Sequence, residues 1–223
     1  MKIAITGTQC IGKTTFVDDF LKKWPMYKTA GGNCSSLIKE KNLKHSQESN
    51  EETQEIFLNY LVDQALSCSK QDHVIFDRCI LDNLAYTMWL NLKGVISDQY
   101  ISRIVPIVRE TIKMYDIIFT TPITKVAPVE IIQNGTRDID PVFREEIDNI
   151  IKAFTESYHK HNGKVFDPAD SPAVIEIFGK PEERIHMAEF YINEKGNMYG
   201  EDESLIQIPP EFNPDLQDIF NKY

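Results

Sequence analysis

The sequence predicts an α/β fold with a mostly parallel sheet, and two observations carry that prediction. Short apolar, β-branched runs alternate along the chain with longer segments whose apolar residues recur at helical spacing. The first of these runs also leads directly into a glycine-rich turn and then a helix. Right-handed crossovers would place the first strand centrally, and ligands of such sheets bind at the carboxyl ends of the strands. We therefore expect functional side chains where strands end.

The individual elements are expected as follows. Strands are expected at residues 2–6, 73–76, 116–120 and 174–178. Helices are expected at residues 12–24, 51–69, 81–92, 97–114, 141–161 and 181–192. Pro25 ends the first helix. The long helix that starts at Pro141 has a well-marked beginning, because Asp140 is suited to cap it and proline is tolerated in a first turn.

The composition limits the classes of function. The 223 residues, 42% of them apolar, fit one domain with a buried core. A formal net charge of -10 disfavours unspecific binding to nucleic acid or to an anionic membrane. Apolar runs are shorter than the roughly 18–20 residues of a membrane span. The start of the sequence has no long apolar run, so we expect no secretory signal. The four cysteines lie far apart without C-x-x-C spacing, so we expect reduced thiols in a cytoplasmic protein.

The segment GTQCIGKTT, which begins at Gly7, has the spacing G-x-x-x-x-G-K-T. It stands between a strand and a helix, the context that distinguishes a phosphate-binding loop from a chance match. Gly7 and Gly12 would let backbone N–H groups point at a phosphate, and the helix dipole adds positive potential. Lys13 is expected to reach the β- and γ-phosphates, Thr14 to ligate Mg²⁺, and Thr15 to lie near the α-phosphate. The alternative is a tight turn that merely uses glycine.

Two charged residues end the second expected strand. Asp77 can take a proton from an attacking hydroxyl or hold a Mg²⁺-bound water, and Arg78 can hold a phosphate oxygen bidentately. The alternative is a local ion pair that closes the strand. On the following helix, Asp82, Asn83 and Tyr86 lie away from the leucine stripe, where they either contact a substrate or form a solvated face.

Two further arginines bracket a polar turn and the start of the long helix. Arg137 and Arg144 are candidates for stabilising a transferred phosphoryl group from a closing loop that excludes water. The alternative is surface arginines paired with nearby acidic residues. After the last strand, Gly179 and Lys180 stand where a turn would cover the adenine base of a bound nucleotide.

Four segments resemble the P-loop nucleoside and nucleotide kinases, especially ribosylnicotinamide kinase-like and phage deoxynucleotide kinase-like domains, with a D-R pair like that of thymidylate kinase-like enzymes. They are MKIAITGTQCIGKTT, VIFDRCILDNLAY, NGTRDIDPVFREEID and IFGKPEERI. The resemblance covers residues 1–195. It implies a three-layer P-loop sandwich with a five-stranded parallel sheet of order 2-3-1-4-5, ATP with Mg²⁺ on the loop, and a lid over residues 134–144. Residues 196–223 are expected to pack on this domain as an extension.

The same resemblance implies roles for single residues. Asp77 matches the strand-end acidic residue, Arg78 the adjacent phosphate-holding arginine, and Arg137 and Arg144 the lid arginines. The expected activity is transfer of the γ-phosphoryl group of ATP to a nucleoside or a nucleoside monophosphate.

The acceptor stays open at this point. Arg78 is the first of six arginines, whereas monophosphate kinases commonly hold the acceptor phosphate with several. Lysine is a point charge without the bidentate fork, so a neutral nucleoside fits as well as a monophosphate. A basic patch at Lys39, Lys41, Lys44 and His45 keeps a hydroxymethylated base in DNA open as the acceptor, against the acidic net charge. A module that binds ATP and hydrolyses it slowly is the competing class, and a homodimer is compatible with the sequence.

Overall fold

The computed structural model describes residues 1–32, 34–125, 140–167, 169 and 171–199. Its centre is a parallel five-stranded sheet of order β2-β3-β1-β4-β5. The strands are β1 (Lys2–Thr6), β2 (Lys28–Thr29), β3 (Val74–Phe76), β4 (Ile117–Thr120) and β5 (Ala173–Glu176). The predicted α/β class, the strand order and the central place of β1 are confirmed.

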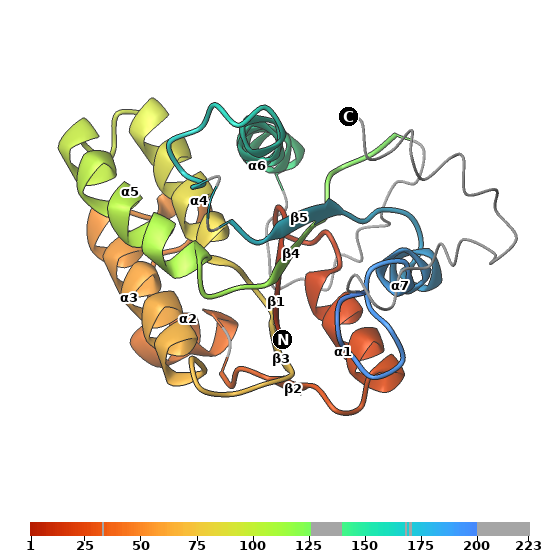
Figure 1. Ribbon diagram of the computed structural model, residues 1–223. Helices are drawn as coiled ribbons and strands as arrows, with labels where there is room; N and C mark the ends of the chain where they lie inside the picture. Colours follow the sequence, from red (N-terminus) through yellow and green to blue (C-terminus); the bar gives the residue numbers. More distant parts are fainter. Residues whose placement is uncertain (33, 126–139, 168, 170, 200–223) are drawn as a thin grey trace, which may run out of the picture.

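Helices cover both faces of the sheet, which gives the expected three layers (Figure 1). The helices are α1 (Lys13–Lys23), α2 (Cys34–Lys41), α3 (Glu51–Ser67), α4 (Ile80–Leu92), α5 (Asp98–Ile112), α6 (Pro141–His159) and α7 (Pro181–Glu189). A short 3₁₀ helix, η1 (Ser46–Glu48), precedes α3. On one face lie α1 and α7; on the other, α4 packs against α3, α5 and α6.

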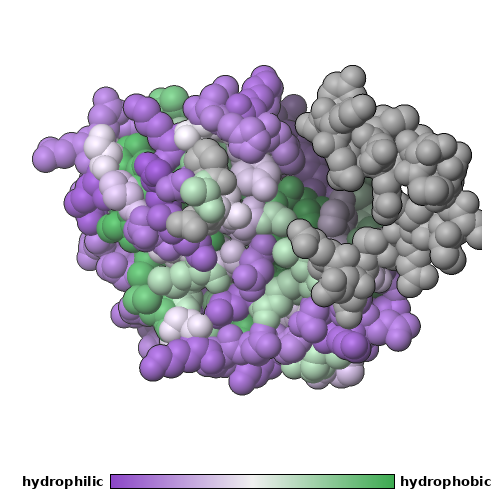
Figure 2. All heavy atoms as spheres, viewed as in Figure 1, coloured by the Kyte–Doolittle hydropathy of each residue, from purple (hydrophilic) through white to green (hydrophobic). Residues whose placement is uncertain are grey.

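The central strand is apolar throughout because each of its faces meets a different core. Ile3 and Ile5 belong to the apolar cluster under α1 and α7, whereas Ala4 belongs to the cluster under the other helices. Successive side chains of a strand point to opposite faces, so a doubly covered strand reads as a continuous apolar run. The outer face seen in Figure 2 is mostly hydrophilic, with apolar residues in small separate groups.

The cluster under α1 is aromatic. Phe20 is fully buried, and its ring centroid lies 4.5 Å from that of Trp24 and 5.0 Å from that of Tyr27. The indole N–H of Trp24 donates to the carbonyl of Asn193, and the hydroxyl of Tyr27 donates to that of Gly196. These two bonds tie the end of α1 to the segment that follows α7.

Several local predictions are confirmed, and three short elements were not predicted. Asp140 caps α6, accepting the backbone N–H groups of Val142 and Phe143, and Pro141 occupies its first turn. The elements missed from the sequence are β2, α2 and η1, and β2 has two residues, both exposed. No helix among the described residues is long and apolar enough to cross a membrane.

Two further expectations fall largely outside the described residues. Of the expected lid, only residues 140–144 are described, and of the expected C-terminal extension only residues 196–199. In that last stretch the N–H of Tyr199 donates to the carbonyl of Tyr191, and Met198 forms a bridge with Ile192. Residues 198 and 199 therefore pair with the residues that directly follow α7.

Removing the ring at the centre of the aromatic cluster tests how the fold holds α1. Phe20→Ala is expected to lower the free energy of unfolding by about 3–5 kcal/mol, because it leaves a cavity among rings that cannot all move in. Chemical denaturation monitored by tryptophan fluorescence measures this. Phe190→Ala, at a site 56% exposed, is the control, and should cost about 0.5 kcal/mol or less. Equal losses in the two variants would contradict this description of the core.

Candidate active site

The glycine-rich loop joins β1 to α1, and its glycines are required by the local geometry. A Cβ atom on Gly7 would lie 2.9 Å from the carbonyl oxygen of Thr121. Gly12 has φ +88°, and a Cβ there would lie 3.0 Å from the guanidinium of Arg184. Cys10 also lies in the left-handed region, with φ 54°. Residues other than glycine are disfavoured in such conformations, so the loop takes a shape that most sequences could not adopt.

Lys13 is buried beneath its own loop. Its ammonium donates to the carbonyl oxygens of Gly7, at 2.5 Å, and Thr8, at 2.8 Å. Burial lowers the pKa of Lys13 to about 8, and the nearby charge of Asp82 opposes that shift. The cation is therefore poorly solvated, and an arriving anion would stabilise it.

Two buried arginines hold the rest of the loop from behind. Arg144 of α6 donates from Nε to the carbonyl of Gln9 at 2.9 Å and from Nη2 to that of Cys10 at 3.4 Å. Arg184 of α7 donates from Nη1 to the carbonyl of Ile11 at 2.8 Å and from Nε to that of Gly179 at 3.0 Å. With Lys13, three cations thus bind every loop carbonyl from residue 7 to residue 11.

This arrangement orients the loop's backbone donors. In a trans peptide the C=O and the next N–H point in opposite directions, and the described chain has no cis peptide. The N–H groups of residues 8–12 are therefore turned away from the cations that bind the carbonyls. Donors so directed at the start of a helix form a site for a phosphate.

Thr14 and Asp77 meet at the edge of the loop. The Thr14 hydroxyl donates to Oδ2 of Asp77 at 2.8 Å. Burial raises the pKa of Asp77, and the hydrogen bond from Thr14 opposes that shift. Mg²⁺ commonly takes one or two protein oxygens and fills its octahedron with water and substrate phosphates. The pair fits such an ion, and the described residues hold no cluster of three or more His, Cys, Asp or Glu that would bind a metal by themselves.

The loop borders a hollow of about 560 Å³, part of it open to solvent, which we call the loop hollow. Its described lining residues are Cys10, Ile11, Gly12, Lys13, Thr14, Thr15, Ser35, Asp77 and Arg78. The residues expected from the sequence to hold phosphates and Mg²⁺ are thus brought together, and Thr15 is among them.

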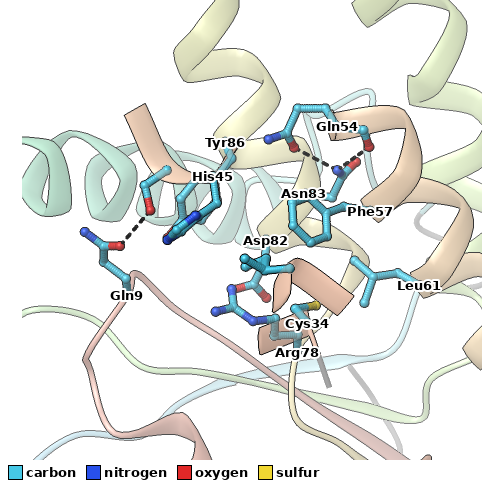
Figure 3. A pocket seen from close by; sticks show the side chains of 12 residues that line it. Gln9, Cys34, His45, Gln54, Phe57, Leu61, Arg78, Asp82, Asn83 and Tyr86 are labelled. Atoms are coloured by element: carbon cyan, nitrogen blue, oxygen red, sulfur yellow. Dashed lines mark hydrogen bonds and ion pairs between the residues drawn. The ribbon is translucent and has the colours of Figure 1, made fainter. Parts of the chain in front are cut away.

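A second hollow of about 600 Å³, part of it open to solvent, lies between α2, η1, α3 and α4, and we call it the side pocket (Figure 3). Its described lining residues are Gln9, Cys34, Ile38, His45, Ser46, Gln54, Phe57, Leu61, Arg78, Asp82, Asn83 and Tyr86. Arg78 lines both hollows, so the two sites are adjacent. The sequence left two interpretations of Asp82, Asn83 and Tyr86: contact with a substrate, or a solvated face. The solvated face is wrong, because all three residues line this pocket and Asp82 and Asn83 are buried.

A network of amides forms one wall of the side pocket. Asn83 donates from Nδ2 to both the backbone carbonyl and Oε1 of Gln54, at 3.0 and 2.9 Å. Gln54 in turn donates from Nε2 to the Ser49 hydroxyl at 2.7 Å, and accepts from Thr87. These bonds fix the Asn83 amide while its Oδ1 is buried without a hydrogen-bond partner (Figure 3). The wall therefore offers an acceptor oxygen to a ligand.

Asp82 lies between the two hollows. Its Oδ2 accepts the backbone N–H of Cys79 at 3.0 Å and so caps α4. Its Oδ1 is 3.6 Å from the ammonium of Lys13 and 3.9 Å from the guanidinium of Arg78. Both distances are longer than a hydrogen bond, and this buried oxygen has no hydrogen-bond partner.

The remaining expected site residues lie as follows. Arg144 contacts the loop by donating to its carbonyl oxygens, and it is not among the described residues that line the loop hollow. Gly179 accepts from Arg184, while Lys180 is exposed and its N–H donates to Glu183 at the start of α7. Arg137 falls outside the described residues.

Sequence reasoning missed Arg184 and much of the side pocket. Arg184 looks like an ordinary charged residue on a short helix. Gln54 carried a usable signal: it lies on the same helical stripe as Phe57, Leu58 and Leu61, where one polar residue interrupts an apolar face. Residues of α2 and η1 carry no motif that would have marked them.

Comparisons with solved structures agree with this architecture. Deoxyadenosine kinase from M. mycoides with bound dATP aligns with 84% of this chain and 96% of its own, with a TM-score of 0.59 and 18% identity. NadR protein in complex with NR aligns with 84% of this chain and 50% of its own, with a TM-score of 0.58 and 13% identity. At such identities the likeness shows the fold alone.

Sequence comparisons give the family. No curated protein sequence matches this chain. The model of a family described as AAA domain matches residues 2–167, which include the loop, Thr14, Asp77, Arg78 and the side pocket. With the match spanning most of the chain, and with the P-loop geometry found in the structure, the protein belongs to this AAA domain family of P-loop proteins.

Proposed function

We propose that this protein is a Mg²⁺- and ATP-dependent kinase that transfers the γ-phosphoryl group to a hydroxyl of a nucleoside. The observation that carries the proposal is the position of Arg78, whose side chain lines both the loop hollow and the side pocket. A phosphoryl group passing from one site to the other would cross at this guanidinium. Hydrolysis of ATP alone would not need a second pocket at that place.

The donor side follows from the loop. The N–H groups of residues 8–12 and the ammonium of Lys13 would hold the phosphates of ATP, while Thr14 and Asp77 would hold Mg²⁺, which neutralises charge on the phosphates when bound. Arg78 would hold an oxygen of the transferred group. Catalysis of this kind consists mainly of positioning and of stabilising charge, and these residues supply both.

The acceptor side follows from the chemistry of the side pocket. Phe57 and Tyr86 offer aromatic surface to a planar ring, and Asn83 offers a fixed amide oxygen to its polar edge. These features fit a nucleobase attached to a sugar.

The charge of the pocket favours an unphosphorylated acceptor. Among its described lining residues Arg78 is the one guanidinium, none is a lysine, and Asp82 stands beside Arg78. A monophosphate would bring about two negative charges into a place where a single cation is already shared with the donor. Two fold neighbours point the same way, since one is named deoxyadenosine kinase and another was solved in complex with NR.

A second candidate acceptor, a hydroxymethylated base in DNA, rests on one observation. Lys44 is exposed and directly precedes His45, which lines the side pocket, and Lys39 and Lys41 are exposed on α2. The net charge of -10 still disfavours a long DNA track. The AAA domain family description leaves room for an ATP-hydrolysing module as well.

A labelling panel tests the function. The protein is given γ-labelled ATP and Mg²⁺ with purine and pyrimidine nucleosides, their monophosphates, ribosylnicotinamide, or DNA carrying hydroxymethylated bases. Label is expected on one or more nucleosides, with monophosphates labelled far more slowly. The Lys13→Ala variant should lose transfer by about a hundredfold or more, because it removes a major electrostatic contact with the phosphates.

The other outcomes assign the alternatives. Label on DNA, with a steep dependence on salt, would support the modified-base acceptor. ATP turnover that no acceptor accelerates would contradict the kinase and favour the hydrolysing module. Preferential labelling of monophosphates would contradict the argument from pocket charge.

The lowered pKa of Lys13 predicts how nucleotide affinity depends on pH. The ammonium form binds phosphate, and with a pKa of about 8 in the free protein it is lost as the pH rises above that value. Bound phosphates raise this pKa, so ATP binding takes up a proton above pH 8, and the dissociation constant should rise by up to about tenfold per pH unit. Titration calorimetry from pH 7 to about pH 9.5 measures this.

The matched control is Lys13→Arg, which stays charged over the whole range. Its dissociation constant is expected to change little between the same pH values, whatever its absolute affinity. Asp77, Arg78 and Asp82 are the other charged groups that act on Lys13, and they remain in both proteins. An equal pH dependence in the two proteins would show that another group is responsible.

A further inference from the structure

We propose that Asp82, and not Asp77, accepts the proton of the acceptor hydroxyl during phosphoryl transfer. The sequence offered Asp77 for two roles at once, holding Mg²⁺ and taking the proton. The structure separates them. This inference rests on the proposed kinase function, and it assigns a catalytic residue within that site.

Asp77 is committed to the side of the site where Mg²⁺ would bind. Its Oδ2 accepts the hydroxyl of Thr14 at 2.8 Å, and both residues line the loop hollow. Asp77 is not among the described residues that line the side pocket.

Asp82 has the position that a proton acceptor needs. It is 2% exposed and lines the side pocket, where the acceptor would bind (Figure 3). Its Oδ2 is fixed by the N–H of Cys79, which sets the orientation of the carboxylate. Among the described residues that line the two hollows, Asp77 and Asp82 are the acidic ones, so Asp82 is the carboxylate left for the acceptor.

The second carboxylate oxygen of Asp82 lacks a hydrogen bond in the empty site. Oδ1 is buried, and it faces Lys13 and Arg78 only at 3.6 and 3.9 Å. A buried oxygen without a hydrogen bond destabilises the protein, and a hydrogen-bond donor that enters the site would remove this cost. Phosphates on the loop would attract both cations, and a hydroxyl in the side pocket would then be the donor nearest to Oδ1.

The chemical step then balances as follows. The acceptor oxygen attacks the γ-phosphorus, and the new O–P bond forms as the bond from that phosphorus to the β–γ bridging oxygen breaks. The electron pair of the broken bond leaves with ADP. The proton of the hydroxyl passes to Oδ1 of Asp82, which releases it to solvent after the products leave.

The test compares two isosteric variants, each assayed with the best nucleoside from the labelling panel. In Asp82→Asn the amide oxygen can still accept the N–H of Cys79, so the cap of α4 is kept while the proton acceptor is lost. Its kcat for transfer is expected to fall by about a hundredfold or more, the usual range for loss of a general base. KM for the nucleoside, the dissociation constant for ATP and the Mg²⁺ concentration for half-maximal rate should change by no more than a few-fold.

Asp77→Asn is the matched variant. It should raise the Mg²⁺ concentration needed for half-maximal rate, which Asp82→Asn should not do. A purely structural role for Asp82 would lower stability and affinity together and would not produce this separation of kcat from the binding constants.

The outcomes distinguish the role proposed for Asp82 from the proposed kinase function. Wild-type protein that labels no acceptor overturns the kinase function and this role with it. Wild-type protein that transfers, with a kcat for Asp82→Asn within about threefold of it, overturns the role of Asp82 alone.

Should Asp82→Asn fail to fold, Asp82→Ala with added formate gives the second measurement. Formate can enter the space left by the side chain and supply a carboxylate, so it is expected to raise the transfer rate by about tenfold or more. Formate without effect on that variant contradicts the proposal.

Discussion

Three buried cations that bind five successive carbonyl oxygens of one loop are the constraint on which the rest of the site depends. Lys13 binds the carbonyls of residues 7 and 8, Arg144 those of residues 9 and 10, and Arg184 that of residue 11. These bonds hold the left-handed turns at Cys10 and Gly12 in place and leave the N–H groups on the opposite side. They also dock α6 and α7 against the loop. Because none of the three cations makes an ion pair closer than 3.6 Å among the described residues, their field is available to an anion.

Residues with more than one structural role also occur where the two hollows meet. Asp82 caps α4 with one oxygen and faces Lys13 and Arg78 with the other, so a residue in the first turn of this helix lines the side pocket and also lies near two residues of the loop hollow. The amide of Asn83, next in the chain, is fixed by Gln54 on α3. The first turn of α4 therefore contributes to the wall of the side pocket, to the surroundings of Lys13 and to the packing between helices.

Much of this could be read from the sequence, and the failures have physical reasons. The loop, β1 and α1 were predictable because one motif needs glycine, lysine and threonine at fixed spacing in a strand–loop–helix context. The two-residue β2 was not, since so short an exposed strand leaves no periodic pattern. Arg184 was missed and Arg144 was expected at the phosphoryl group, because sequence shows that an arginine is present but not that burial directs its guanidinium to backbone carbonyls. The side pocket depends on contacts among α2, η1, α3 and α4, which distant segments of sequence create only after folding.

The most direct test of this account is the affinity of the loop for Mg²⁺-ATP when a cation behind it is removed. Arg184→Met takes away a guanidinium that donates to two backbone carbonyls, those of Ile11 and Gly179. The account predicts that calorimetry will find ATP binding weakened by about tenfold or more, since hydrogen bonds from a charged group are lost and the loop loosens. Arg103→Met, on the exposed face of α5 and paired with Glu55, should bind ATP like the wild type. A folded Arg184→Met protein with wild-type ATP affinity would contradict the claim that these buried cations shape the loop.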